Sequence, residues 1–96
     1  MREVVFSERA LRELEEISLY LKHKFSIKTK NEFVDKVERL VLQLQKTPDL
    51  FPKSELNNYH KAVIVKQVSV FYRFDDKKIN IISVFDTRQN PKKIKN

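Results

Sequence analysis

Apolar residues recur at steps of three and four positions in the first half of the chain, which is the spacing of one face of an α-helix. A first stripe comprises Ala10, Leu14, Ile17, Leu21 and Phe25. A second stripe comprises Phe33, Val37, Leu40, Val41 and Leu44. Charged residues stand between the members of each stripe, so the pattern predicts two amphipathic helices that pack together as a hairpin.

Short polar residues mark where these helices begin. The run EVVF at 3–6 predicts a strand, and the following Ser7 predicts a helix N-cap with Glu8 in the first turn. Thr29 and Glu32 have the spacing of a capping box, which predicts the start of the second helix.

The second half of the chain is rich in β-branched and aromatic residues. After TPDLFP at 47–52, whose prolines end the helical part, three runs favour strands: KAVIVKQ, VSVFYRF and KINIISVFD. The residues DDK at 75–77 supply a hairpin turn. In VSVFYRF, alternation places Ser69, Phe71 and Arg73 on one face of the strand. The core face of the same strand is predicted to hold Val68, Val70, Tyr72 and Phe74.

The elements follow in the order β-α-α-β-β-β. This order predicts the α+β class, with a helical hairpin packed on one face of a curved, mainly antiparallel sheet. We expect one domain that spans residues 1–96, since this length suffices for one core. The other sheet face is expected to be partly open, and its lining candidates are Lys61, Ser69, Phe71, Arg73 and Arg88.

Composition excludes several kinds of chemistry. The chain has no cysteine and no glycine, which excludes disulfides, thiolate catalysis and a glycine loop for phosphate. His23 and His60 are far apart on different elements, so we expect no metal site and no cofactor. Glu13, Glu15 and Glu16 are expected on the solvated side of the first helix.

Positive charge is concentrated in the second half of the chain. Residues 1–51 hold ten basic and nine acidic residues, net +1, whereas residues 52–96 hold ten and four, net +6. A basic half favours a partner such as nucleic acid or an acidic protein, and the alternative is a basic surface that serves solubility. No apolar run approaches the roughly 20 residues that span a bilayer. We therefore expect a cytoplasmic protein without a membrane partner.

Four residues have side chains suited to the cleavage of RNA through its own 2′-hydroxyl. That reaction needs a base, an acid and positive charge near the phosphorane. Tyr59, His60, Lys61 and Arg88 are able to fill these roles. For Tyr59 and His60 the alternative is packing at the start of a strand. For Arg88 the alternative is a salt bridge to Asp86.

Nearly the whole chain resembles the RelE/ParE superfamily of bacterial type II toxin–antitoxin systems. VVFSERALRELEEISLYL is similar to the opening strand and first helix of that family. TPDLFP is similar to its turn after the helices, and VFYRF with INIISVFDTRQNPKK to its final hairpin and arginine-bearing end. The resemblance implies a small toxin that a co-expressed antitoxin neutralises by wrapping its C-terminal segment around the toxin.

The superfamily divides by mechanism. Members like RelE cut mRNA in the ribosomal A site with basic residues of the sheet, whereas members like ParE poison DNA gyrase and have no known nuclease centre. By resemblance, Lys61 matches a basic position at the start of the second strand, and Arg88 matches the arginine after the last strand. These two are the catalytic candidates if the chain is RelE-like. Ser69 stands where the nucleases carry an arginine, and the tail after Pro91 has no tyrosine or histidine.

Three functions remain open at this point. The favoured one is a ParE-like toxin that inhibits DNA gyrase or a related target. The alternatives are a RelE-like ribosome-dependent endoribonuclease and a nontoxic module that binds nucleic acid. The candidates for binding the target or the antitoxin are Lys61, Lys66, Arg73, Arg88, Lys92 and Lys93.

Overall fold

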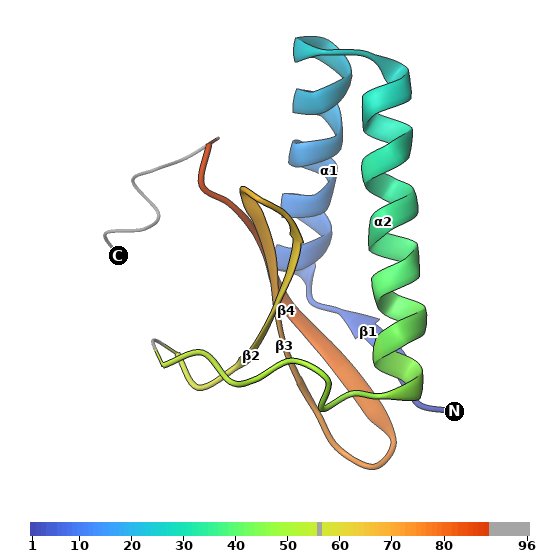
Figure 1. Ribbon diagram of the computed structural model, residues 1–96, viewed down its shortest axis with the longest axis vertical. Coiled ribbons are helices and arrows are strands. Elements are labelled where there is room, and N and C mark those ends of the chain that lie inside the picture. The colour runs from blue at the N-terminus through green and yellow to red at the C-terminus, as the bar shows by residue number, and fades with distance from the viewer. Residues whose placement is uncertain (56, 89–96) are drawn as a thin grey trace.

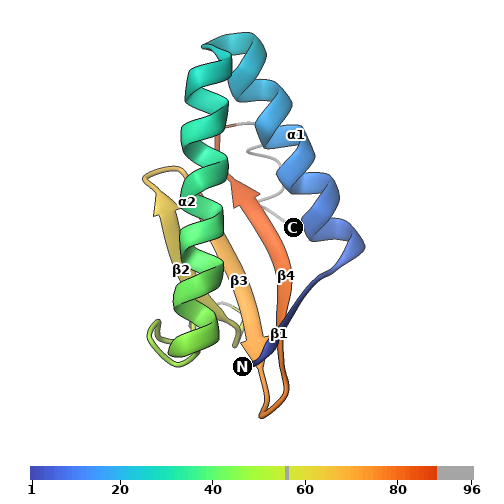
Figure 2. The ribbon, with the colours of Figure 1, turned by 90° about the vertical axis from the view of Figure 1, so that its right-hand side faces the viewer.

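Two helices cover one face of a four-stranded sheet in the computed structural model, which describes residues 1–55 and 57–88 (Figures 1 and 2). Helix α1 spans Glu8–Lys24 and helix α2 spans Ile27–Lys46. They form an antiparallel hairpin whose tip extends beyond the sheet (Figure 1). The order β-α-α-β-β-β and the α+β class are confirmed.

The sheet has the strand order β1-β4-β3-β2. Its strands are β1 (Glu3–Phe6), β2 (His60–Val65), β3 (Val68–Phe74) and β4 (Lys78–Asp86). The last three strands pair antiparallel as a meander, and β1 pairs parallel with β4. The sheet is therefore mainly antiparallel, as predicted, and its longest strand lies in the interior.

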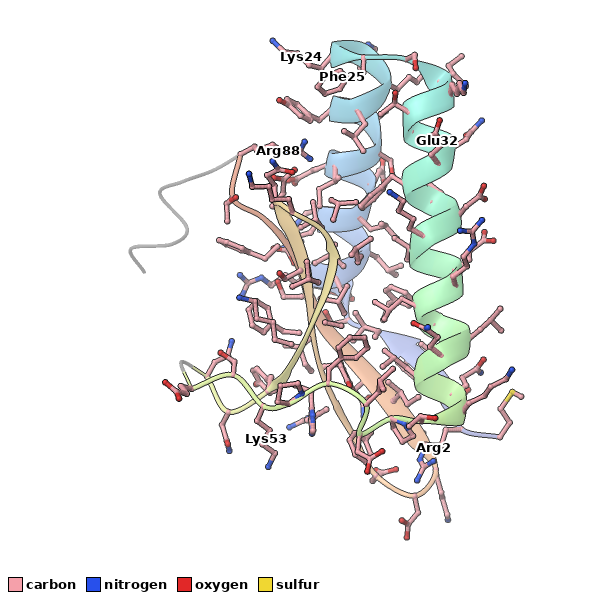
Figure 3. All side chains as sticks on the ribbon, viewed as in Figure 1. Arg2, Lys24, Phe25, Glu32, Lys53 and Arg88 are labelled. Carbon is pink, nitrogen blue, oxygen red and sulfur yellow. The ribbon has the colours of Figure 1, made fainter. Side chains whose placement is uncertain are left out.

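Helix α1 begins where the sequence predicts and α2 begins earlier. The Ser7 side chain accepts a hydrogen bond from the backbone N–H of Ala10 and caps α1. The predicted capping box at Thr29 is wrong, because Ser26 is the N-cap of α2 and accepts from the N–H of Thr29. The assignment of Phe25 to the first apolar stripe is also wrong. It follows the last residue of α1 at the tip of the hairpin and is 57% exposed (Figure 3).

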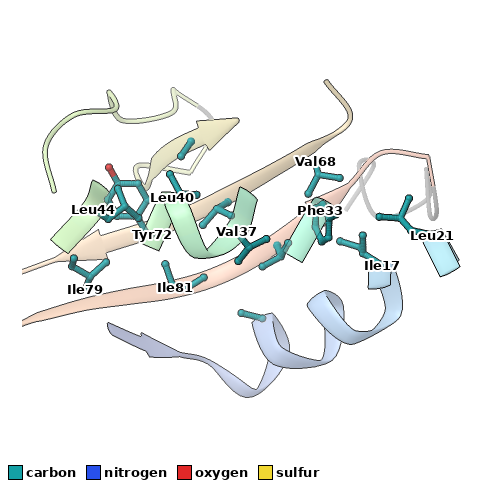
Figure 4. Close-up of a cluster of buried hydrophobic side chains, with 14 residues drawn as sticks. Ile17, Leu21, Phe33, Val37, Leu40, Leu44, Val68, Tyr72, Ile79 and Ile81 are labelled. Carbon is teal, nitrogen blue, oxygen red and sulfur yellow. The ribbon is translucent and has the colours of Figure 1, made fainter. Parts of the chain in front are cut away.

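The hydrophobic core lies between the hairpin and the meander (Figure 4). Large side chains of this core that are almost completely buried are Ile17, Leu44, Val68, Val70, Tyr72, Ile79, Ile81 and Val84. Burying a side chain of this size stabilises the fold by about 1.5–3 kcal/mol. Tyr72 also donates its hydroxyl to the carbonyl of Pro48 at 2.7 Å, which ties the segment after α2 to the middle of the sheet.

Glu13 is buried, which contradicts the prediction that it lies on the solvated side of α1. One carboxylate oxygen accepts from the hydroxyl of Ser83 at 2.8 Å and from the backbone N–H of Val84 at 3.1 Å. Strand β1 pairs with β4 only as far as Ile81, so α1 covers the rest of that edge. The Glu13 carboxylate therefore satisfies an N–H that has no strand beside it.

No helix in the described part of the chain is both long enough and apolar enough to cross a bilayer.

Candidate functional site

The sheet face opposite the helices, here called the open face, carries the candidate site. Alternation turns Ala62, Val70 and Val84 toward the helices and their strand neighbours away from them. The row of the open face next to the β2–β3 turn consists of Val63, Ser69 and Phe85, which are paired across β2, β3 and β4. Val63 is 57% exposed. The cross-strand neighbours of Ser69 on the open face are therefore both apolar.

Two of the predicted cations lie close together on this face. Lys61 is paired with Phe71 across the β2–β3 ladder, and Arg73 is two residues farther along β3. Diagonal neighbours of this kind are about 7–8 Å apart. Lys61 and Arg73 are both exposed. Lys66 is exposed in the turn between β2 and β3, at the other end of β3 from Arg73.

Arg88 is held by its own strand and by α1. The buried carboxylate of Asp86 accepts from the backbone N–H of Arg88 at 2.8 Å, from Nε at 3.2 Å and from Nη2 at 3.3 Å. The guanidinium carbon lies 5.8 Å from the ring centroid of Tyr20, and the Arg88 side chain is 28% exposed. Figure 3 shows Arg88 at the end of the sheet beside α1. The expected alternative, a salt bridge to Asp86, is therefore present.

The structure does not bring Lys61 and Arg88 together. Lys61 belongs to the row of Phe71, whereas Asp86 belongs to the row of Val68, and three residues of β3 separate these rows. That separation is roughly 10 Å along the strand. Arg88 also lines a small cavity of about 160 Å³ together with Phe33 of α2. Its side chain is thus directed toward the helices.

The last two binding candidates, Lys92 and Lys93, lie outside the residues that the structure describes.

His60 is packed among aromatic rings, which is the alternative expected for it. Its ring centroid lies 5.2 Å from that of Tyr72 and 5.1 Å from that of Phe74. Its Nδ1 contacts the carbonyl of Phe51 at 2.5 Å, so Nδ1 carries the proton. Burial raises the pKa of the neighbouring Tyr72 phenol, which keeps that hydroxyl neutral and able to donate.

Sequence reasoning missed two contributors to these surroundings. Tyr20 packs against the guanidinium of Arg88, and Lys53 lies near Arg73 at the edge of a polar pocket. Lys53 forms an isolated bridge with His60, which brings the segment after α2 alongside β2. A lysine one residue after Pro52 gives no signal of this pairing in the sequence.

Within residues 1–55 and 57–88, no group of histidine and carboxylate side chains has the arrangement of a metal site.

Solved structures with the same fold include several toxins. The chain matches the chromosomal ParDE toxin–antitoxin system from P. aeruginosa with a TM-score of 0.73 and 17% identity, covering 90% of this chain and 96% of that one. It matches the YoeB dimer from Staphylococcus aureus with a TM-score of 0.61 and 22% identity, over 88% and 94% of the two chains. It matches the E. coli DinJ–YafQ complex with a TM-score of 0.59 and 14% identity, over 92% and 96%. No curated protein sequence matches the chain.

A family comparison gives the assignment. The model described as the ParE toxin of the type II toxin–antitoxin system parDE matches residues 4–91, which is most of the chain. The matched segment includes both helices and all of the four strands except Glu3, the first residue of β1. The chain therefore belongs to the ParE toxin family of type II toxin–antitoxin systems, within the RelE/ParE superfamily.

Proposed function

We propose that this toxin arrests growth in the cytoplasm by binding DNA gyrase or a related protein target, and that it does not cut mRNA. The observation that carries this proposal is the pair of apolar side chains, Val63 and Phe85, that flank Ser69 on the open face near the β2–β3 turn. An apolar patch with cations beside it is the composition of a protein-binding surface.

The same row gives little support to a nuclease. Stabilising a phosphorane needs a cation close to the reacting phosphate, and loss of such a group costs several kcal/mol of transition-state stabilisation. Ser69 has no charge to offer, and its cross-strand neighbours are apolar. Arg88 uses two of its side-chain N–H groups on Asp86. A role for Lys61 and Arg88 as a catalytic pair would require Arg88 to leave that carboxylate.

A cognate antitoxin is the second partner in this proposal. Two structural neighbours are toxin–antitoxin complexes, DinJ–YafQ from E. coli and YoeB–YefM from Staphylococcus aureus. We expect the antitoxin to cover the open face with apolar residues over Val63 and with carboxylates near the cations. The cations proposed to contact the antitoxin or the target are Lys61, Lys66, Arg73, Arg88, Lys92 and Lys93.

Induced expression of the chain alone in bacteria tests the proposal. We expect growth arrest, filamentation and DNA damage signalling, with translated messages intact by primer extension over the first minutes. Purified toxin should inhibit supercoiling by purified gyrase. Cuts in register with codons would instead establish the RelE-like endoribonuclease, for which the proximity of Lys61 and Arg73 is the favouring observation. Harmless expression would leave the nontoxic binding module.

A matched pair of variants tests the open face itself. Val63 and Leu42 are apolar residues with nearly equal exposure, 57% and 56%, and they lie on the open face and on α2 respectively. Val63→Asp should abolish arrest, because it places a charge in the proposed contact, whereas Leu42→Asp should still cause arrest. Thermal unfolding of both variants, made by cell-free synthesis without the antitoxin, checks that each one folds, because the antitoxin is itself expected to contact Val63. Equal arrest by both variants would contradict a target contact at the open face.

A further inference from the structure

A polar pocket of about 520 Å³ opens at the end of the sheet where β2 begins and β3 ends. One wall is the loop that contributes Lys53, Asn57, Asn58 and Tyr59, and the other is Arg73 of β3. His60 and Phe74 complete the lining. We call this site the Arg73 pocket. Its volume is within the range of pockets that hold small organic ligands.

Both cations of the Arg73 pocket lack a carboxylate partner. Among residues 1–55 and 57–88, neither Lys53 nor Arg73 takes part in an ion pair, and both are exposed. The carboxylate nearest to Arg73 in sequence, Asp75, accepts instead from the backbone N–H groups of Lys77 and Lys78 at 2.8 Å each. The pocket therefore offers two free positive charges from two different elements.

The loop wall is held in shape by backbone hydrogen bonds. The N–H of Ser54 donates to the carbonyl of Tyr59 at 2.6 Å, and the N–H of Asn58 donates to the carbonyl of Ser54 at 3.2 Å. The side-chain oxygen of Asn57 accepts from the N–H of Tyr59 at 3.1 Å. Asn58 has φ of 63°, a left-handed conformation that asparagine tolerates. These bonds, together with the backbone bridge between Lys53 and His60, hold the backbone of the loop wall in place before any ligand arrives, which reduces the ordering cost of binding.

Aromatic rings add a second recognition element. His60, Tyr72 and Phe74 contact one another, so their rings are already occupied. Tyr59 lines the same pocket and has no ring partner among the described residues. A half-buried tyrosine beside two cations provides a surface on which a nucleobase can stack.

We propose that the Arg73 pocket binds one nucleotide unit, with its phosphate between Lys53 and Arg73 and its base against Tyr59. Two cations from separate elements suit a phosphate, whose several oxygens accept charge-assisted hydrogen bonds in different directions. The Tyr59 ring favours a nucleotide over an acidic side chain of a peptide, because a nucleotide carries an aromatic base that can stack on the ring and an acidic side chain does not. The site is separate from Ser69 and Arg88, and it shares Arg73 with the surface proposed to contact the antitoxin or the target.

Calorimetric titration of the full-length toxin tests this site. The probes are inorganic phosphate, adenosine monophosphate, a short single-stranded RNA and a polyglutamate peptide. Adenosine monophosphate should bind more tightly than inorganic phosphate, and polyglutamate more weakly than either nucleotide probe. Arg73→Gln and Lys53→Gln should each weaken nucleotide binding by about tenfold or more, as expected for loss of a charge-assisted hydrogen bond. Tyr59→Ala should weaken the binding of the nucleotide but not of phosphate.

Matched charge controls come from the helices. Arg12 of α1 and Lys28 of α2 are exposed cations outside the pocket. Arg12→Gln and Lys28→Gln remove the same charge and should change the affinity by about twofold or less, since only long-range attraction is lost. Equal losses in all four variants would show general polyanion attraction and overturn the proposal. Failure of every phosphate probe to bind, or tighter binding of polyglutamate, would also overturn it.

The two nucleotide probes separate the possible sources of the ligand. A free nucleotide is the ligand if adenosine monophosphate and RNA bind with similar affinity and weak dependence on salt. A strand is the ligand if RNA binds about tenfold tighter and its affinity falls steeply with salt, because further phosphates release counterions. Either result supports the site, provided that Arg73→Gln and Lys53→Gln reduce the affinity.

Discussion

Arg88 and Arg73 lie at opposite ends of the sheet, and each has an aspartate two residues away in sequence, yet only Arg88 pairs with its aspartate. Asp86 precedes Arg88, faces the helix side and has a side chain that is only 2% exposed. Asp75 follows Arg73 in an exposed turn and binds two backbone N–H groups. The burial of the carboxylate, and not the spacing of the pair, decides whether the arginine is used internally.

A second carboxylate is also used inside the protein, between α1 and β4. Glu13 of α1 is buried next to β4 and pairs with Arg9, whose side chain is 57% exposed. At the Arg73 end, Lys53 and Arg73 keep their charges for a ligand. The same residue types thus build a structural anchor at one end of the sheet and a binding site at the other.

The largest expected effect belongs to Glu13 at the anchored end. Glu13→Ala removes the acceptor for the Ser83 hydroxyl and the Val84 N–H and leaves both donors buried. Each unsatisfied donor costs about 1–3 kcal/mol, so the free energy of unfolding should fall by about 3 kcal/mol. Urea denaturation measures this loss.

Glu13→Gln is the matched control for that prediction. Its amide oxygen can still accept from both donors, so the loss should be about 1 kcal/mol or less. A loss as large as that of Glu13→Ala would show that the negative charge, and not the hydrogen bonds to β4, is what stabilises this end of the sheet.

The fold was predictable because periodicity alone separates the helices from the strands. The misplacement of Glu13 shows where that reasoning stops. Glu13 lies three residues after Ala10 and four before Ile17, which is the spacing of the buried stripe itself. Its charge is the reason why the sequence analysis placed it on the solvated side of the helix. Its burial depends on where the pairing of β1 with β4 ends, which is at Ile81. The pattern of apolar residues does not reveal which residues of two strands are paired.

A medium effect is expected from Asp86. Asp86→Ala leaves the Arg88 guanidinium without its partner in a site that is only partly open to water. Breaking a fully buried pair costs about 3–5 kcal/mol, and partial exposure of Arg88 reduces this to about 2 kcal/mol. Denaturation of Asp86→Ala, Arg88→Ala and the double variant gives the coupling energy directly.

The coupling energy from these three variants decides whether Arg88 stabilises the fold through Asp86. A coupling energy of about 1 kcal/mol or more would confirm the anchor. A coupling energy near zero would contradict the anchor and would leave the Arg88 guanidinium available to an anion of the antitoxin or the target.

The candidate site was less predictable than the fold, for a physical reason. Alternation correctly placed Ser69, Phe71 and Arg73 on one face, because side chains of a strand must alternate. The predicted start of α2 was wrong because Ser26 and Thr29 are both able to cap a helix, and the chain uses Ser26. The pocket at Arg73 arises from a loop that returns to β2 through backbone hydrogen bonds, which composition does not reveal.

The smallest effect is expected at the Arg73 end, in the titration of Asp75. Hydrogen bonds from the N–H groups of Lys77 and Lys78 lower the pKa of the Asp75 carboxyl below its ordinary value. Its contribution to stability is therefore complete above the ordinary value and is lost as the pH falls through the lowered pKa. NMR titration of the carboxyl carbon measures the midpoint. Arg73→Gln should leave that midpoint unchanged, because the turn and not the arginine binds the carboxylate. A rise in the midpoint would mean that Asp75 pairs with Arg73, and the two ends of the sheet would then use their arginines alike.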